Sequence, residues 1–66
     1  MCLLKVFIEG SQSKEPIAKE VILAVKNGDS VELYDQTLNK VSVVENAEIA
    51  KVDMLNETLT LVKRGA

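Results

Sequence analysis

The sequence predicts an all-β fold, a small SH3-like barrel of short antiparallel strands, and three observations carry this prediction. Hydrophobic residues make up 47% of the chain but aromatic residues only 3%. The core must therefore be built from Val, Ile and Leu, and β-branched residues favour sheets over helices. Several short apolar segments follow one another at close spacing. Asn27-Gly28 is the strongest short hairpin signal, because both residues tolerate the positive φ of a type I′ turn.

The first half of the chain contains two expected strands and one ambiguous segment. Residues 3–8 form a continuous β-rich run with apolar groups on both faces. Residues 10–16 are polar and contain the only proline, which indicates a surface loop. Residues 17–26 show both helical spacing of apolar residues and a buried-strand pattern. The hairpin signal that follows favours a strand over residues 22–26 and leaves residues 17–20 open.

Four further strands are expected in the second half: residues 30–35, 41–44, 49–53 and 58–62. In the first of these, Val31 and Leu33 are expected to point inward. Asn46 lies in a break between strands, where asparagine accepts a left-handed conformation at modest cost. Residues 55–57 form the turn of the last hairpin, and residues 63–66 are expected to form a frayed tail.

The length of the chain predicts a single domain, residues 1–66, that needs stabilisation from outside its own core. A domain of this size buries roughly 60% of the surface that its unfolded chain exposes. One cysteine cannot form an internal disulfide, and there is no histidine or second cysteine for a zinc site. Self-association is the remaining common means of stabilisation, so we expect a homodimer.

Charge and hydropathy predict a cytoplasmic protein that binds neither nucleic acid nor membrane. The formal net charge is −2, from ten acidic and eight basic side chains scattered without runs, so a basic footprint for nucleic acid is absent. The longest apolar run, residues 21–25, is far too short to span a bilayer. A free thiol also suits a reducing compartment.

Catalytic patterns are weak, and we expect a protein that is not an enzyme. The sequence has no histidine to act as a base near neutral pH, and its three glycines are isolated rather than gathered in a phosphate-binding loop. Four carboxylates stand at or near strand ends, where solvated acidic groups are ordinary: Asp35, Glu45, Glu48 and Asp53.

The most distinctive chemistry belongs to the single cysteine, Cys2, which follows Met1. An ionised thiol is a soft metal ligand, and a nitrogen of Met1 or Cys2 is a second donor only a few bonds away, so a small chelate ring closes without strain. The alternative interpretation is that Cys2 is a small hydrophobe packed at the start of a strand.

The order of features resembles the CooT family of small nickel-binding accessory proteins. The resemblance lies in Met1-Cys2 running into the strand of residues 3–8, the hairpin of residues 27–33, and the closing segments of residues 49–55 and 58–61. It implies a homodimeric SH3-like protein that binds nickel through Cys2 and assists nickel insertion into carbon monoxide dehydrogenase or acts with the maturation proteins of that enzyme.

Donor counting agrees with this implication. One chain offers one sulfur and one or two nitrogens, whereas a divalent metal takes about four donors, so two chains would complete a square N2S2 set with one Ni(II) per dimer. Zinc and Cu(I) remain chemical rivals for a thiolate site.

Two alternatives from other functional classes stay open. The chain could be a small-barrel module that binds RNA or a protein, with Cys2 merely packed, although its acidic balance weakens RNA binding. Alternatively, Cys2 could sense redox state through a disulfide between two copies.

Overall fold

The computed structural model describes residues 3–12 and 14–64, and strands account for 62% of these residues, with no helix among them. The strands are β1 (Leu4–Ile8), β2 (Ala18–Val21), β3 (Leu23–Asn27), β4 (Ser30–Tyr34), β5 (Lys40–Glu45), β6 (Ala47–Asp53) and β7 (Thr58–Lys63). The all-β prediction is therefore confirmed.

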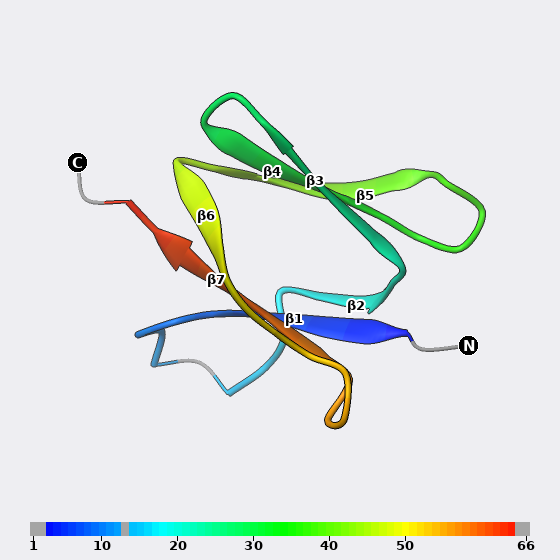
Figure 1. Cartoon of the computed structure of the whole chain (residues 1–66), viewed down its shortest axis with the longest axis horizontal. Helices are drawn as coiled ribbons and strands as arrows, with labels where there is room; N and C mark the ends of the chain where they lie inside the picture. Colours follow the sequence, from blue (N-terminus) through cyan, green and yellow to red (C-terminus); the bar gives the residue numbers. More distant parts are fainter. Residues whose placement is uncertain (1–2, 13, 65–66) are drawn as a thin grey trace.

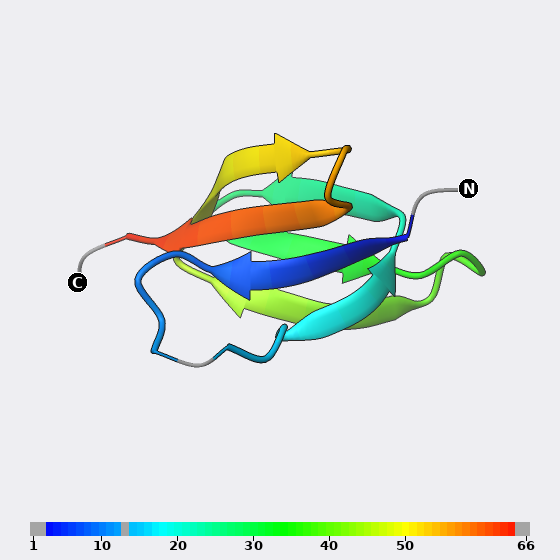
Figure 2. The same cartoon turned by 90° about the horizontal axis from the view of Figure 1, so that it is seen from below.

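The strands form two sheets that lie face to face (Figures 1 and 2). One sheet has the strand order β2-β1-β7-β6 and the other β3-β4-β5. The expected barrel is not closed, because no ladder joins the two sheets in the part of the chain that the structure describes. At one corner the sheets meet through a backbone hydrogen bond of 3.1 Å from Ala47 N to Asp29 O.

One pair of strands departs from the expected antiparallel arrangement. β1 pairs with β7 in parallel, with Lys5 opposite Thr58 and Ile8 opposite Leu61. The intervening chain crosses to the second sheet and back, so the first and last strands enter their sheet in the same direction (Figure 2). The prediction of a purely antiparallel fold was wrong on this point.

The ambiguous segment before the first hairpin is a strand. β2 pairs antiparallel with β1, with Leu4 opposite Val21, and Ile17 N donates to Val6 O at 2.7 Å. Glu20 has φ 58°, which places the irregularity of this pairing beside it. Pairing with β1 therefore prevails over the helical spacing of residues 17–25.

The chain turns where expected, with Gly28 at φ 62° in the β3–β4 hairpin and Asn46 at φ 54° at the junction of β5 and β6. The expected type I′ turn over Asn27-Gly28 is wrong, because Asn27 pairs with Ser30 and the turn residues are Gly28 and Asp29, of which only Gly28 has positive φ, as in a type II′ turn. At Asn46 the chain leaves one sheet and enters the other, because a single left-handed residue reverses its course sharply.

The core lies between the inner faces of the two sheets and is wholly aliphatic. Val31 and Leu33 point inward from β4 as expected, and both are fully buried. The buried residues are Val6, Val21, Val31, Leu33, Val44, Ala47, Leu59 and Leu61. No polar or charged side chain is buried among the residues that the structure describes.

The outer face of β3-β4-β5 is also rich in aliphatic side chains. Val25, Glu32 and Val43 stand in one cross-strand row of this sheet. Four of these aliphatic side chains are exposed: Leu23, Val25, Val41 and Val43. This second apolar face explains how 47% of the residues are hydrophobic while the core stays small.

Candidate functional site

The two predicted metal ligands, Met1 and Cys2, lie outside the described residues. What the structure does place is the strand that follows them. Leu4 pairs with Val21 of β2, and Lys5 N donates to Glu57 O at 3.0 Å in the turn between β6 and β7. The start of β1 therefore lies between β2 and the β6–β7 turn.

The described part of the chain offers no alternative metal centre built from several ligands. No three residues of the types His, Cys, Asp and Glu come together within residues 3–12 and 14–64. No pocket opens in the surface of these residues either. Within this part of the molecule, the candidate carboxylates must therefore be examined one by one.

Asp35 organises the β4–β5 turn. Its Oδ1 accepts hydrogen bonds from the Thr37 hydroxyl at 2.7 Å, from Thr37 N at 2.9 Å and from Asn39 N at 3.0 Å. These bonds, chiefly the one from the Thr37 hydroxyl, lower the pKa of the Asp35 carboxyl. The carboxylate thus holds a turn in which Leu38 adopts φ 64°.

Asp53 has the same role in the β6–β7 turn. Its Oδ2 accepts from Asn56 Nδ2 at 2.8 Å and its Oδ1 from Asn56 N at 3.1 Å. The Asn56 side chain is the main cause of the lowered pKa of Asp53, and Lys51 lowers it further. Both aspartates singled out in the sequence are thus turn anchors.

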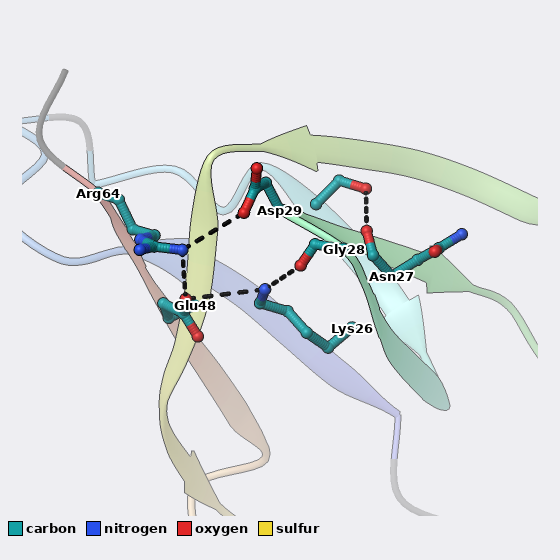
Figure 3. Close-up of polar contacts among 7 residues, drawn as sticks. Lys26, Asn27, Gly28, Asp29, Glu48 and Arg64 are labelled. Atoms are coloured by element: carbon teal, nitrogen blue, oxygen red, sulfur yellow. Dashed lines mark hydrogen bonds and ion pairs between the residues drawn. The ribbon is translucent and has the colours of Figure 1, made fainter.

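Glu48 belongs to a network of charges where the sheets meet (Figure 3). Glu48 Oε2 lies 3.1 Å from Arg64 Nη1 and 3.7 Å from Lys26 Nζ. Arg64 Nη1 also lies 3.4 Å from Asp29 Oδ1, and Lys26 donates to Gly28 O. These contacts connect β6 and the end of β7 to the β3–β4 turn.

Glu45 is placed differently from Glu48. It pairs with Ser30 in the β4–β5 ladder, and its backbone carbonyl accepts from Lys63 Nζ at 2.7 Å. No contact joins the Glu45 carboxylate to the other three. Asp35 and Asp53 lie in two different turns, and Glu48 belongs to the charge network. The four carboxylates therefore do not form one site.

The sequence analysis did not predict the polar network around Glu32. The Tyr34 hydroxyl donates to Glu32 Oε1 at 2.9 Å, Asn27 Nδ2 donates to Glu32 Oε2 at 3.2 Å, and Lys40 Nζ lies 3.6 Å from Glu32 Oε2. Asn27 first and Tyr34 second lower the pKa of Glu32, while Glu32 raises the pKa of Tyr34. The spacing of Glu32 and Tyr34, two apart on one strand face, was the available signal.

The fold defines the class of small all-β domains in which two sheets enclose a single aliphatic core. The family model of the CO dehydrogenase accessory protein CooT matches residues 1–62. The chain therefore belongs to the CooT family, as the resemblance in the sequence indicated. No curated protein gives a significant match.

As a member of this family, the chain has an accessory role for CO dehydrogenase. This role is consistent with a part in maturation of that enzyme. CooT is a family of accessory proteins, and such a role implies contact with CO dehydrogenase or its maturation machinery. Within the described ranges no helix is long and apolar enough to cross a membrane.

Proposed function

We propose that this protein is a nickel carrier for CO dehydrogenase, in which Ni(II) is the cargo and the Cys2 thiolates of two chains hold it. The observation that carries the proposal is the extent of the family match, which begins at residue 1 and so includes Met1-Cys2. Cys2 is the one thiol of the sequence, and there is no histidine.

The donor chemistry fits a shared ion better than a site within one chain. A thiolate and a nitrogen of the Met1-Cys2 segment supply two donors, and a second copy supplies two more. The resulting N2S2 set suits the square-planar geometry that Ni(II) adopts. The carboxylates of Asp35 and Asp53 accept hydrogen bonds within their own turns.

The fold supports the proposal by anchoring the strand that follows Cys2. β1 is flanked by β2 on one side and β7 on the other, and its Val6 is fully buried. Cys2 lies only two residues before β1 begins at Leu4. Two residues of extended chain span at most about 7 Å, so a metal at Cys2 stays close to the sheet.

A Ni(II) titration at neutral pH tests the proposal, with wild type compared with Cys2→Ser and with Glu45→Gln as a matched surface control. We expect thiolate-to-nickel absorption to saturate at one ion per two chains in wild type and in Glu45→Gln. Cys2→Ser should lose this saturation. Equal weak binding by all three proteins would refute the proposal.

The pH dependence gives a second test of the same site. Each donor must lose a proton to bind, so nickel occupancy should fall steeply between pH 8 and pH 5. Competition with Zn(II) and Cu(I) in the same assay measures selectivity, since thiolates bind these metals as well. Equal nickel occupancy at both pH values would contradict thiolate binding.

A second candidate function is supported by the exposed aliphatic outer face of β3-β4-β5, which favours a protein-binding module in which Cys2 is only packed. On this alternative, nickel has no effect on the protein, and wild type and Cys2→Ser bind the maturation machinery equally. A pull-down of CO dehydrogenase with both variants, with and without nickel, distinguishes the two functions.

A further inference from the structure

We infer that the outer face of β3-β4-β5 docks a protein segment that places an arginine on Glu32 and apolar side chains on the aliphatic residues beside it. This docking goes beyond nickel binding, because it concerns how the chain recognises a protein partner. It rests on the part of the proposed function in which the chain contacts CO dehydrogenase or its maturation machinery, and it is independent of the metal site.

The outer face of β3-β4-β5 carries a carboxylate between aliphatic side chains. Val31 and Leu33 of β4 are buried in the core, so Glu32 between them points to the outer face, which is turned away from β1 (Figure 1). Val25 and Val43 stand on either side of Glu32 in one cross-strand row. The exposed aliphatic residues of this face are Leu23, Val25, Val41 and Val43. Apolar side chains gathered on one face indicate an interaction site.

The Glu32 carboxylate is held in place and partly shielded from water. Its side chain is only 15% exposed, although it lies on an outer face. Asn27 Nδ2 donates to its Oε2 at 3.2 Å, and the Tyr34 hydroxyl donates to its Oε1 at 2.9 Å. These bonds, first the one from Asn27, lower the pKa of the Glu32 carboxyl, so it is ionised at neutral pH. The face therefore presents a preformed negative charge, which costs less conformational entropy on binding than a mobile side chain.

This charge decides what kind of segment can cover the valines beside it. A partner that packs on Val25 and Val43 also removes the remaining water from Glu32, and burying a charge is costly unless it is paired and hydrogen-bonded. A carboxylate has about four acceptor positions, and the bonds from Asn27 and Tyr34 occupy two of them. Arginine supplies several donors in a planar fork that matches a carboxylate. A wholly apolar segment supplies none, so an arginine between apolar residues fits the face better.

Lys40 leaves room for this arginine. Its Nζ lies 3.6 Å from Glu32 Oε2, and its side chain is 47% exposed at the edge strand β5. An exposed lysine loses side-chain entropy in an ion pair and gains little from it in water. A partner's arginine can therefore join Lys40 at the carboxylate or displace it.

The charge balance of the outer face also favours a cationic partner. Glu45 stands opposite Ser30 at the end of β5, on the same face as Glu32, whereas Lys40 is the base that meets Glu32 there. Complementary charge selects partners and suppresses wrong ones, because like charges brought together are repelled. The face is thus suited to a basic protein segment and unsuited to the phosphates of a nucleic acid.

The test titrates isotope-labelled protein with the peptide acetyl-Ser-Leu-Thr-Arg-Thr-Leu-Ser-amide, whose leucines and arginine lie on one side of an extended chain. A second peptide carries citrulline, an uncharged isostere, in place of the arginine. Amide chemical shifts give both the binding surface and the dissociation constant. We expect the arginine peptide to shift amides of β3, β4 and β5, and the citrulline peptide to bind about 10-fold or more weakly, because a hydrogen bond between charged groups is lost.

Two pairs of variants locate the contact. Glu32→Gln keeps the size of the side chain and removes its charge, so it should weaken the arginine peptide about 10-fold or more and bind both peptides alike. Glu48→Gln, which removes a carboxylate from the network of Arg64, is the matched control. Val43→Ser should weaken both peptides about 3-fold or more through lost apolar contact. Its control is Ile17→Ser, because Ile17 has similar exposure, 44% against 40%, and lies beside β1. Circular dichroism checks the fold of each variant.

The outcomes separate this inference from the proposed function. If neither peptide binds, if both bind wild type equally, or if Glu32→Gln binds the arginine peptide as wild type does, the inference is wrong. It is also wrong if the shifts lie outside β3-β4-β5, or if Val43→Ser changes the oligomeric state in sedimentation equilibrium, which would make the face an interface between copies. Cys2→Ser should bind the arginine peptide as wild type does, with and without Ni(II). A failed nickel titration would therefore refute the carrier proposal and leave the peptide result to decide the role of this face.

Discussion

Replacing Leu61 by alanine should lower the free energy of unfolding by a large fraction of its total. Leu61 is fully buried in β7, where it stands opposite Ile8 of β1 on one side and Ile49 of β6 on the other. Within residues 3–12 and 14–64, eight hydrophobic residues are buried, and three of them are leucines.

The expected magnitude follows from burial and chain length. Leu→Ala at a fully buried site destabilises proteins by about 2–5 kcal/mol, through lost transfer free energy and the cavity left behind. A chain of 66 residues has a free energy of unfolding of about 3–10 kcal/mol. The substitution therefore removes from about a fifth to all of the stability.

Urea unfolding at fixed protein concentration measures this loss, since dimerisation would make the midpoint depend on concentration. With a slope of roughly 1 kcal/mol per M urea for a small domain, we expect the midpoint to fall by about 2–5 M. Leu38→Ala is the matched control, because Leu38 is 62% exposed in the β4–β5 turn. If Leu61→Ala shifts the midpoint no more than Leu38→Ala does, the described core is wrong.

Three further predictions concern turns and surface charges. Gly28→Ala should lower the free energy of unfolding by about 1–2 kcal/mol, measured by thermal unfolding. Gly28 has φ +62° and open space around it, so only backbone strain opposes the new methyl group. An unchanged stability would contradict the conformation of this turn. In the folded protein the pKa values of Glu32, Asp35 and Asp53 lie below the ordinary values of 4.5 for Glu and 3.8 for Asp. These carboxylates therefore stabilise the fold fully above their ordinary pKa values. The stabilisation is lost as the pH falls through their lower, folded-state pKa values. Acid unfolding of Asp35→Asn should accordingly be less steep than that of wild type, and an equal slope would contradict this. Arg64→Ala should lower the free energy of unfolding by less than about 1 kcal/mol, because both partners of its ion pair with Glu48 are about half exposed. High salt should remove the difference from wild type. A larger loss that persists in high salt would contradict this estimate.

The hairpins could be predicted from the sequence because their signals are local. Glycine adopts a positive φ readily whatever surrounds it, and Gly28 has φ 62°, although Asn27 ends β3 and is not one of the two turn residues. Asn46 was expected in a left-handed conformation for the same reason, and the structure confirms it. The inward direction of Val31 and Leu33 follows from the alternation of side chains along a strand.

The candidate site was only partly predictable. Residues 1–62 match the CooT family, as the resemblance suggested. The roles of the carboxylates, by contrast, could be assigned only from their contacts in the tertiary structure. Asp35 and Asp53 anchor turns through partners two to four residues away, whereas Glu48 meets Arg64 and Lys26 from distant segments. Only contacts of the first kind leave a pattern in the sequence.

By itself, the sequence determined the all-β class, the two well-marked hairpins, the inward-facing residues of β4 and the single thiol, Cys2. Each of these depends on a residue's own conformational or chemical preference. The tertiary structure alone decided that β1 and β7 pair in parallel, that residues 18–21 join β1 as a strand, and that the β6–β7 turn lies beside the start of β1. Those features depend on hydrogen bonds between segments up to 53 residues apart, such as Lys5 and Thr58. A local sequence pattern does not show which distant strand will pair with the backbone hydrogen-bond donors and acceptors of a given strand.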